Sequence, residues 1–414
     1  MIRRPGAILA LLTGLNLLNY LDRLVVSAVL PKITVDLQLS NFMGGLLATI
    51  FLIGYFVTAP IFGSLGDRMA RKWLIAFGVI VWSAATCASG LATTATELLI
   101  ARAFVGIGEA SYATLAPTII DDITPPERKG GALAWFYGAT PVGAALGYLV
   151  GGFVEARWGW RTAFFVAGGP GLAIALVCLL IAEPARVVSK EKADIKRDFR
   201  TLMTADLYRK GVIGFCAYTA AVGAFSYWAP TFLYKRYDLP LKDANFRFGL
   251  ITVVAGLMAT IIGGKWADLM RARVVRENKG DAERETVRGL LRICAIGSAM
   301  AAPLALACFL SPSSTIFFVL VFLCILALFL GTSPINAVIL LAVPTHLRAS
   351  ALALSIFAIH VFGDLWSPPV VGVLADHFPI QLAMMALPLA VAASALLWWP
   401  LKGPAAASGP KPET

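Results

Sequence analysis

Four charged residues interrupt segments that are otherwise apolar. Asp22 and Arg23 lie in one such segment, and Arg102 and Glu109 lie in another. A charge near the middle of a bilayer costs at least about 2.5 kcal/mol, so such residues usually mark the path of a substrate or a proton. A carboxyl group can bind and release a proton, whereas a guanidinium group stays charged and binds phosphate or carboxylate through paired hydrogen bonds. The four residues therefore indicate proton transfer beside anion binding.

Helical spacing limits how these charges can pair. Arg102 and Glu109 are seven residues apart, which places them about 10.5 Å apart on one helix face. Tyr112 continues that face. Asp22 and Arg23 are adjacent, so their side chains point about 100° apart and cannot face each other. We predict the pairs Asp22–Arg102 and Arg23–Glu109 between the two helices, and the opposite pairing is also open.

The four charges form a neutral set that has two interpretations. In the functional one, which we favour, Glu109 or Asp22 takes up a proton while Arg23 and Arg102 bind an anionic substrate. Tyr112 is a further candidate for contact with that substrate. In the alternative, the set is a purely structural network of ion pairs.

The second half of the sequence has fewer polar residues within apolar segments. The main ones are Asn336, His360 and Asp364. His360 and Asp364 are four residues apart, so they can hydrogen-bond on one helix face. A structural pair is the favoured interpretation, and lining of a substrate cavity or a second titrating role is the alternative. All three are secondary candidates for substrate binding.

Composition identifies the elements that carry these residues. Hydrophobic residues make up 58% of the 414 residues and charged residues 14%, against about 25% charged residues in soluble domains. One bilayer span uses about 20 apolar residues, so the roughly 240 present suffice for about twelve spans. Uncharged stretches, together with segments around Arg102 and Asp364, give twelve helices, with a break at Ser311–Ser314. This excludes a soluble enzyme and predicts an all-α polytopic membrane protein.

The positive charge of the chain predicts its orientation. With twelve helices both termini share one side, and assigning loops alternately puts 26 Lys and Arg residues there and seven on the other side. Because cytoplasmic loops are enriched in positive charge, both termini are predicted to be cytoplasmic. The net charge of +11 then reflects topology, and no nucleic-acid partner is expected.

Two similar decapeptides divide the chain into halves. Gly63–Lys72 lies between the second and third helices, and Gly264–Arg273 lies 201 residues later, between the eighth and ninth. Parallel six-helix halves with a substrate site at their interface are a known transporter plan. The predicted parts are an N-terminal half (1–182), a cytoplasmic linker (183–210), a C-terminal half (211–401) and a disordered cytoplasmic tail (402–414).

The first decapeptide resembles the signature of the major facilitator superfamily, roughly G-x-L-A/G-D-R-x-x-R-K, at every defining position. The resemblance implies the major facilitator fold and a cytoplasmic gate that forms in the outward-open state. Arginines of the motif are expected to pair with Asp121 or Asp122, although a basic loop that only sets topology is the alternative. The second copy lacks the arginine after its acid, so its contacts should be weaker. The predicted gate residues are Gly63, Asp67, Arg68, Arg71, Asp121 and Asp268.

A second resemblance covers about residues 15–186. Leu18–Arg23, Ala101–Thr118 and Pro141–Tyr148, with Gly66–Arg68, resemble the Spinster family, whose animal members move sphingosine-1-phosphate or lysophospholipids. It implies a monomeric, proton-coupled secondary active transporter of a lipid-like anionic amphiphile, in the plasma or bacterial inner membrane. The same four charged residues would serve it. A proton-driven exporter of drugs or other organic anions is the alternative within transport.

Other classes of site have no matching motif. The six cysteines lie in apolar runs without metal-binding spacing. No phosphate-binding, nucleophile-elbow or zinc-protease string occurs. We therefore expect no cofactor and no metal, and a membrane-embedded lipid enzyme is a remote alternative. The expected partners are the substrate, protons and membrane lipids.

Overall fold

The computed structural model describes residues 2–125, 128–183, 195–277 and 281–399. Within these ranges the chain is almost entirely helical, and the one β-type contact is an isolated bridge between Ile2 and Ile181. Twelve helices in the described part are long and apolar enough to cross a membrane. The predicted all-α polytopic architecture is confirmed.

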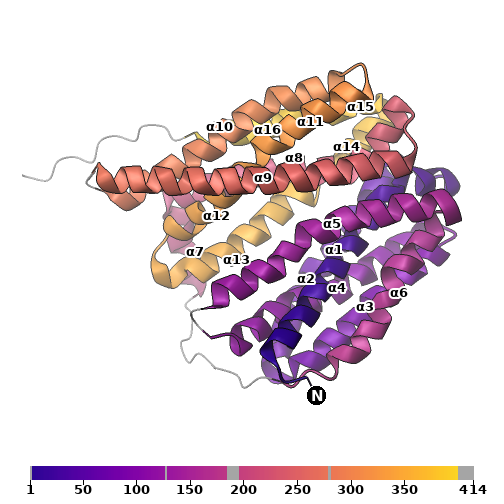
Figure 1. The fold of residues 1–414 in the computed structure, drawn as a ribbon, viewed down its shortest axis with the longest axis horizontal. Coiled ribbons are helices and arrows are strands. Elements are labelled where there is room, and N and C mark those ends of the chain that lie inside the picture. The colour runs from indigo at the N-terminus through magenta and orange to yellow at the C-terminus, as the bar shows by residue number, and fades with distance from the viewer. Residues whose placement is uncertain (1, 126–127, 184–194, 278–280, 400–414) are drawn as a thin grey trace, which may run out of the picture.

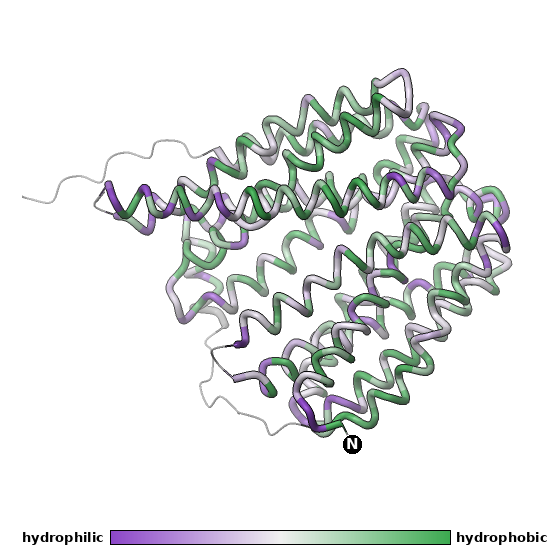
Figure 2. The backbone as a smooth tube through the Cα atoms, in the orientation of Figure 1, coloured by the Kyte–Doolittle hydropathy of each residue, from purple (hydrophilic) through white to green (hydrophobic). Residues whose placement is uncertain are grey.

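Six of these helices form the N-terminal half, drawn from indigo to magenta in Figure 1. They are α1 (Pro5–Asp36), α2 (Asn41–Arg68), α3 (Arg71–Leu91), α4 (Ala95–Ile123), α5 (Lys129–Trp158) and α6 (Trp160–Cys178). Figure 2 shows apolar residues along most of each helix and hydrophilic residues gathered near helix ends. This distribution is the one that spanning helices require, because their backbone groups are satisfied internally and their side chains face lipid.

The C-terminal half begins after the short helix α7 (Ile195–Thr204), which falls within the predicted linker 183–210. Three of its spans are continuous helices and three are interrupted. The continuous spans are α8 (Asp206–Tyr237), α9 (Leu241–Arg276) and α10 (Ala282–Leu310). The first interrupted span consists of α11 (Ser314–Phe329) and α12 (Thr332–Leu341). The second consists of α13 (Arg348–Ile359), η3 (His360–Asp364) and α14 (Ser367–His377), and the short η2 (Thr345–Leu347) precedes it. The third consists of α15 (Ile380–Met384) and α16 (Ala386–Trp398).

Local signals set several of these boundaries. The predicted break at Ser311–Ser314 is confirmed, because α10 ends at Leu310 and the Ser313 hydroxyl accepts a hydrogen bond from the Ile316 amide to begin α11. Such a cap satisfies a backbone donor that the first helical turn leaves free. The predicted tail, residues 402–414, lies outside the described residues.

The two halves meet at one end of the bundle. We call the end at which α1 connects to α2 the distal end, and the opposite end, which holds the N-terminus and α7, the proximal end (Figure 1). Between the halves, α5 packs against α9, α2 against α14 and α1 against α8. In the described part of the chain, the hydrogen bonds that join the halves come from the distal parts of the helices. They include Ser27 to Tyr227 (2.6 Å), Tyr227 to Gly44 (2.7 Å), Tyr148 to Ser226 (2.6 Å) and Asn245 to Ala28 (3.0 Å).

Asp376 fastens α14 to the beginning of α2 at the distal end. Its Oδ1 accepts hydrogen bonds from the Asn41 backbone (2.7 Å) and side-chain amides (2.8 Å), and its Oδ2 accepts from the Phe42 amide (2.9 Å). A carboxylate is stabilised there by the free N–H groups and the dipole of α2. Gly372 allows the close approach, since a Cβ at that position would lie 2.4 Å from the Asn41 carbonyl oxygen.

Replacing this capping carboxylate should loosen the distal end. In a Ser27→Cys background, Asp376→Ala removes the hydrogen bonds to Asn41 and Phe42 and leaves the N-cap Ser40 of α2 in place. A side-chain cap contributes about 0.5–2 kcal/mol. We expect the cysteine at position 27 to react about threefold faster or more with a membrane-impermeant thiol reagent. Asp243→Ala, at an exposed acid near the same end, should leave the rate unchanged. Equal rates in both variants would contradict a closing role for Asp376.

Candidate functional site

The four charged residues lie together within the N-terminal half. Asp22 and Arg23 occupy the middle of α1, and Arg102 and Glu109 lie on α4. Asp22, Arg102 and Glu109 are buried, with 1%, 3% and 0% of their surface exposed, whereas the Arg23 side chain is 19% exposed. Arg23 is therefore the member of the set that a ligand can reach first.

Arg23 and Glu109 form the ion pair expected from the sequence. Arg23 Nε lies 2.6 Å from Glu109 Oε2. A charge-assisted hydrogen bond of this kind offsets part of the cost of burying both groups. The second oxygen of Glu109, Oε1, has no hydrogen-bond partner among the described residues.

The expected pair between Asp22 and Arg102 does not form. Asp22 Oδ2 instead accepts a hydrogen bond of 2.5 Å from the Thr86 hydroxyl on α3. Asp22 Oδ1 and the Nε and Nη1 atoms of Arg102 have no hydrogen-bond partner in the described part of the chain. One carboxylate oxygen of Asp22 is thus directed to α3. Buried polar atoms of this kind are uncommon and point to water or a ligand.

Aromatic rings surround the two guanidinium groups. The Phe51 ring on α2 lies 4.9 Å from Arg23 Cζ and 5.0 Å from Arg102 Cζ. Tyr20 and Tyr55 lie 5.0 and 5.4 Å from Arg23 Cζ. Cation–π contacts of this kind stabilise a guanidinium group where water is scarce. Sequence reasoning missed these rings, because aromatic residues are common throughout an apolar helix and nothing marks the ones that face a charge.

A glycine on α4 sets the position of Phe51. A Cβ at Gly106 would lie 2.0 Å from the Phe51 carbonyl oxygen, so only glycine permits α2 and α4 to come this close. Gly106 is one turn from Arg102, and the same close contact therefore places Phe51 against the guanidinium group. Gly106 thus helps to position the aromatic ring of the charged site.

Tyr112, less than one turn after Glu109 on α4, is fully packed. It is 1% exposed, its hydroxyl donates to the Leu12 carbonyl oxygen at 2.5 Å, and its ring meets Trp82 edge-on at 5.6 Å. Both its ring and its hydroxyl are used inside the N-terminal half. The predicted contact between Tyr112 and substrate is therefore not supported.

His360 and Asp364 form a pair in the C-terminal half. His360 Nδ1 lies 2.9 and 3.0 Å from the two carboxylate oxygens of Asp364 in the π-helical turn η3. The Phe56 ring of α2 lies 5.4 Å from the His360 ring, so the pair sits where the halves meet. Their side chains are 29% and 23% exposed. Asn336, by contrast, is exposed on α12 and donates to Thr332 of its own helix.

The predicted gate residues cluster at the proximal end of the N-terminal half. Arg71 Nη1 lies 2.7 Å from Asp122, and Arg71 Nε lies 3.0 Å from Glu183, which sequence reasoning missed. Asp121 pairs with Lys129 at 2.6 Å instead. The remaining members are placed on two helices: Gly63, Asp67 and Arg68 at the end of α2, and Asp268, exposed, on α9. In the described residues, no ion pair joins this cluster to the C-terminal half.

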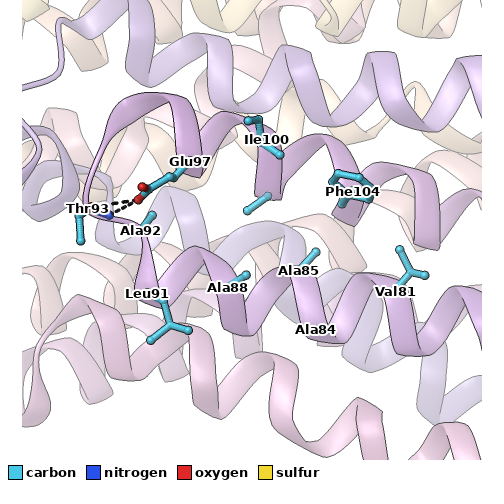
Figure 3. A pocket seen from close by; sticks show the side chains of 11 residues that line it. Val81, Ala84, Ala85, Ala88, Leu91, Ala92, Thr93, Glu97, Ile100 and Phe104 are labelled. Carbon is cyan, nitrogen blue, oxygen red and sulfur yellow. Dashed lines mark hydrogen bonds between the residues drawn. The ribbon is translucent and has the colours of Figure 1, made fainter.

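A groove of about 750 Å³ lies between α3 and α4 near the distal end, outside the charged set (Figure 3). Alanines form much of its wall, and Glu97 lies at its mouth. The Glu97 carboxylate accepts hydrogen bonds from the Thr93 amide (2.7 Å) and hydroxyl (3.0 Å) and from the Thr94 amide (3.3 Å), which completes the cap of α4. Glu97 is therefore occupied with local structure, and none of the predicted site residues lines this groove.

Comparison with known proteins identifies relatives along most of the chain. The family model described as Major Facilitator Superfamily matches residues 12–363. Protein spinster of Drosophila melanogaster is 35% identical over 87% of this chain, which spans 60% of that protein. The probable sphingolipid transporter spinster homolog 2 of Arabidopsis thaliana is 31% identical, with 90% of this chain and 81% of that protein covered.

A solved structure shares the fold. It is a bacterial homologue of the human lysosomal transporter Spinster in an inward-facing, occupied conformation, and it aligns with a TM-score of 0.82 at 22% identity. The alignment covers 96% of this chain and 97% of that one. The twelve-helix arrangement described above is thus the major facilitator fold.

The double contact of Phe51 gives a stability test. Phe51→Leu removes a ring that stabilises two guanidinium groups, at about 0.5–2 kcal/mol each. Phe62→Leu makes the same change at another buried phenylalanine of α2, with no arginine contact described there. We expect Phe51→Leu to lower the midpoint of thermal unfolding in detergent clearly more than Phe62→Leu. Equal shifts would show that the arginines do not depend on the ring.

Proposed function

The chain belongs to the Major Facilitator Superfamily and, within it, to the Spinster-type transporters, and we propose that it moves a lipid-like anionic amphiphile across the bilayer by alternating access. A lysophospholipid or a sphingosine-phosphate type of molecule fits this description. The family makes the protein a transporter and not an enzyme. The Arabidopsis relative, a probable sphingolipid transporter, supports a lipid-like substrate.

The main support for this function is the ion pair between Arg23 and the buried Glu109, at 2.6 Å. Arg23 is partly exposed and presents its planar fork beside three aromatic rings. Such a guanidinium group can bind the phosphate of a head group bidentately, while the rings contact the adjoining apolar part. Arg102, with two unpartnered nitrogen atoms, supplies a second donor group.

Proton coupling follows from competition for Arg23. With Glu109 ionised, Arg23 is neutralised by its partner, and an anionic substrate has to displace a carboxylate. When Glu109 takes up a proton, the charge of Arg23 is left for the substrate. Protonation and anion binding then favour each other, as linked equilibria require. Asp22 is the alternative proton carrier, because its Oδ1 also lacks a partner.

The closed distal end defines a state of the proposed cycle. If both termini are cytoplasmic, as the charge distribution predicts, the structure is inward-facing, in the plasma or bacterial inner membrane. Contacts between the halves at the proximal end would then form only in the outward-facing state. We propose that the gate residues Asp67, Arg68 and Arg71 on one side and Asp268 on the other take part in that closure; the helix bounds put the first three at the adjoining ends of α2 and α3 and the fourth on α9. We propose that a monomer carries out the cycle.

The C-terminal half contributes a polar wall to the proposed substrate path. His360 and Asp364 are partly exposed next to Phe56 of α2. We propose that they line the path opposite Arg23. A proton-driven exporter of drugs or other organic anions would use the same charged set, and competition by lysophospholipid in a binding assay separates the two substrates.

Removing the carboxyl group of Glu109 tests the proton role. In proteoliposomes, Glu109→Gln should bind substrate but lose the stimulation of uptake by a pH gradient, because glutamine cannot carry a proton. Glu97→Gln, at the α4 cap, should keep the stimulation. Full gradient dependence in Glu109→Gln would remove Glu109 as the proton site. Loss of the dependence in Asp22→Asn alone would assign the role to Asp22.

Truncating Arg23 tests the head-group role. A hydrogen bond to a charged group contributes about 1.5–3 kcal/mol, so Arg23→Ala should weaken binding of an anionic lysophospholipid by about tenfold or more. Binding of an uncharged monoacylglycerol should change little. Arg157→Ala, at an exposed arginine of α5, serves as the control for loss of one positive charge. Unchanged lysophospholipid affinity in Arg23→Ala would overturn the assignment, and Arg102→Ala would then test the second guanidinium.

A further inference from the structure

A second groove lies on the outer surface of the C-terminal half, where α9 runs beside α11. Its volume is about 470 Å³. Each helix contributes one face, with residues spaced three or four positions apart. The lining residues are Arg247, Leu250 and Ile251 from α9, and Thr315, Phe318, Val319, Phe322 and Leu323 from α11. Leu250, Val319 and Leu323 are 53%, 59% and 41% exposed, so the groove is open toward lipid.

The groove begins at the level where the polar and apolar parts of the bilayer meet. Arg247 directly precedes the uncharged stretch Phe248–Gly264 of α9. Thr315 lies in the first turn of α11, at the same end. From Thr315 to Leu323 the helix rises about 12 Å, and this length of groove carries no charged side chain. The groove therefore has a polar end at Arg247 and Thr315, and the rest of it is apolar along both helices.

Arg247 has no polar partner at this mouth. Among the described residues it forms no hydrogen bond or ion pair, and Asp243, one turn earlier, is not within ion-pair distance. Its Cζ lies 5.7 Å from the Phe318 ring, which orients the guanidinium group over the groove. An exposed arginine at a membrane boundary keeps its head at the polar level while its stem lies on apolar surface.

The groove between α3 and α4 offers a contrast. Its mouth carries Glu97, whose carboxylate is already bonded within the cap of α4. The groove between α9 and α11 has a cation whose hydrogen-bond donors are free and has no acidic lining residue. Its charge therefore complements an anion, and no lining residue can pair with the amine of a zwitterionic head group.

We propose that the groove between α9 and α11 binds an anionic phospholipid of the bilayer leaflet at the distal end. The phosphate lies on Arg247 with the Thr315 hydroxyl beside it, and one acyl chain lies along Leu250, Val319 and Leu323. A guanidinium group suits phosphate because two N–H groups can donate in parallel. This site is separate from the charged set on α1 and α4, so its occupant is a resident lipid and not the transported molecule.

Native mass spectrometry tests this site with the full-length protein from nanodiscs that contain equal amounts of phosphatidylglycerol and phosphatidylcholine. The wild-type protein should retain phosphatidylglycerol in preference. An arginine near the membrane surface contributes about 1 kcal/mol to binding an anionic lipid, so Arg247→Gln should reduce the retained phosphatidylglycerol about fivefold. Val319→Trp, which fills the groove without changing charge, should reduce it similarly.

Matched variants distinguish lipid binding in this groove from a general effect of surface charge and from lipid binding at the central site. Arg157→Gln removes an arginine at the same end that stacks on Phe153 at 4.6 Å, and Leu396→Trp enlarges a residue of α16 that is 78% exposed. Both should retain the lipid as the wild type does, and so should Arg23→Ala. An equal loss of phosphatidylglycerol in Arg157→Gln would show that the effect comes from general surface charge. Loss in Arg23→Ala would place the lipid in the central site, and equal retention of the two lipids by the wild type would exclude head-group recognition.

Discussion

A charge inside a membrane has to be neutralised, and this constraint determines how the N-terminal half is built. Arg23 and Glu109 neutralise each other across α1 and α4 at 2.6 Å. The pair is worth little as a source of stability, because desolvation of two ions offsets most of their attraction. In the proposed cycle its value lies in what happens when one partner changes its charge, since the other is then left buried and unpaired. The surrounding packing keeps the pair in place until that change occurs.

Backbone contacts between helices provide that packing. Gly106 lets α4 lie against the backbone of α2, which places Phe51 over both guanidinium groups. At the interface between the halves, Gly372 similarly lets α14 lie against the start of α2. Helix α2 is thus held by α4 within its own half and by α14 in the other. A movement of the halves that parts α14 from α2 therefore acts on the helix that carries Phe51.

The sequence predicted the twelve helices and the pair between Arg23 and Glu109, because apolar length and a seven-residue spacing are properties of one or two helices. It did not predict the partner of Asp22, which depends on how α3 is rotated and places Thr86 within 2.5 Å. The packed position of Tyr112 also has a geometric reason. Ten residues after Arg102, a helix has turned almost three times and points about 80° away, toward Trp82 and the core. Spacing along one helix could not reveal Phe51 or Glu183, which come from other elements.

The difference in exposure between Arg23 and Glu109 bears on the order of events in the proposed cycle. Glu109 has no exposed surface, and its carboxylate accepts a hydrogen bond from Arg23, which is itself 19% exposed. A proton can reach Glu109 only after Arg23 moves or water enters beside it. An anionic head group that draws Arg23 away would do both. Substrate binding would then open the route for the proton, and the proton would keep Arg23 from returning until the substrate has left. Coupling of this kind needs no second proton site, because one arginine alternates between two anions.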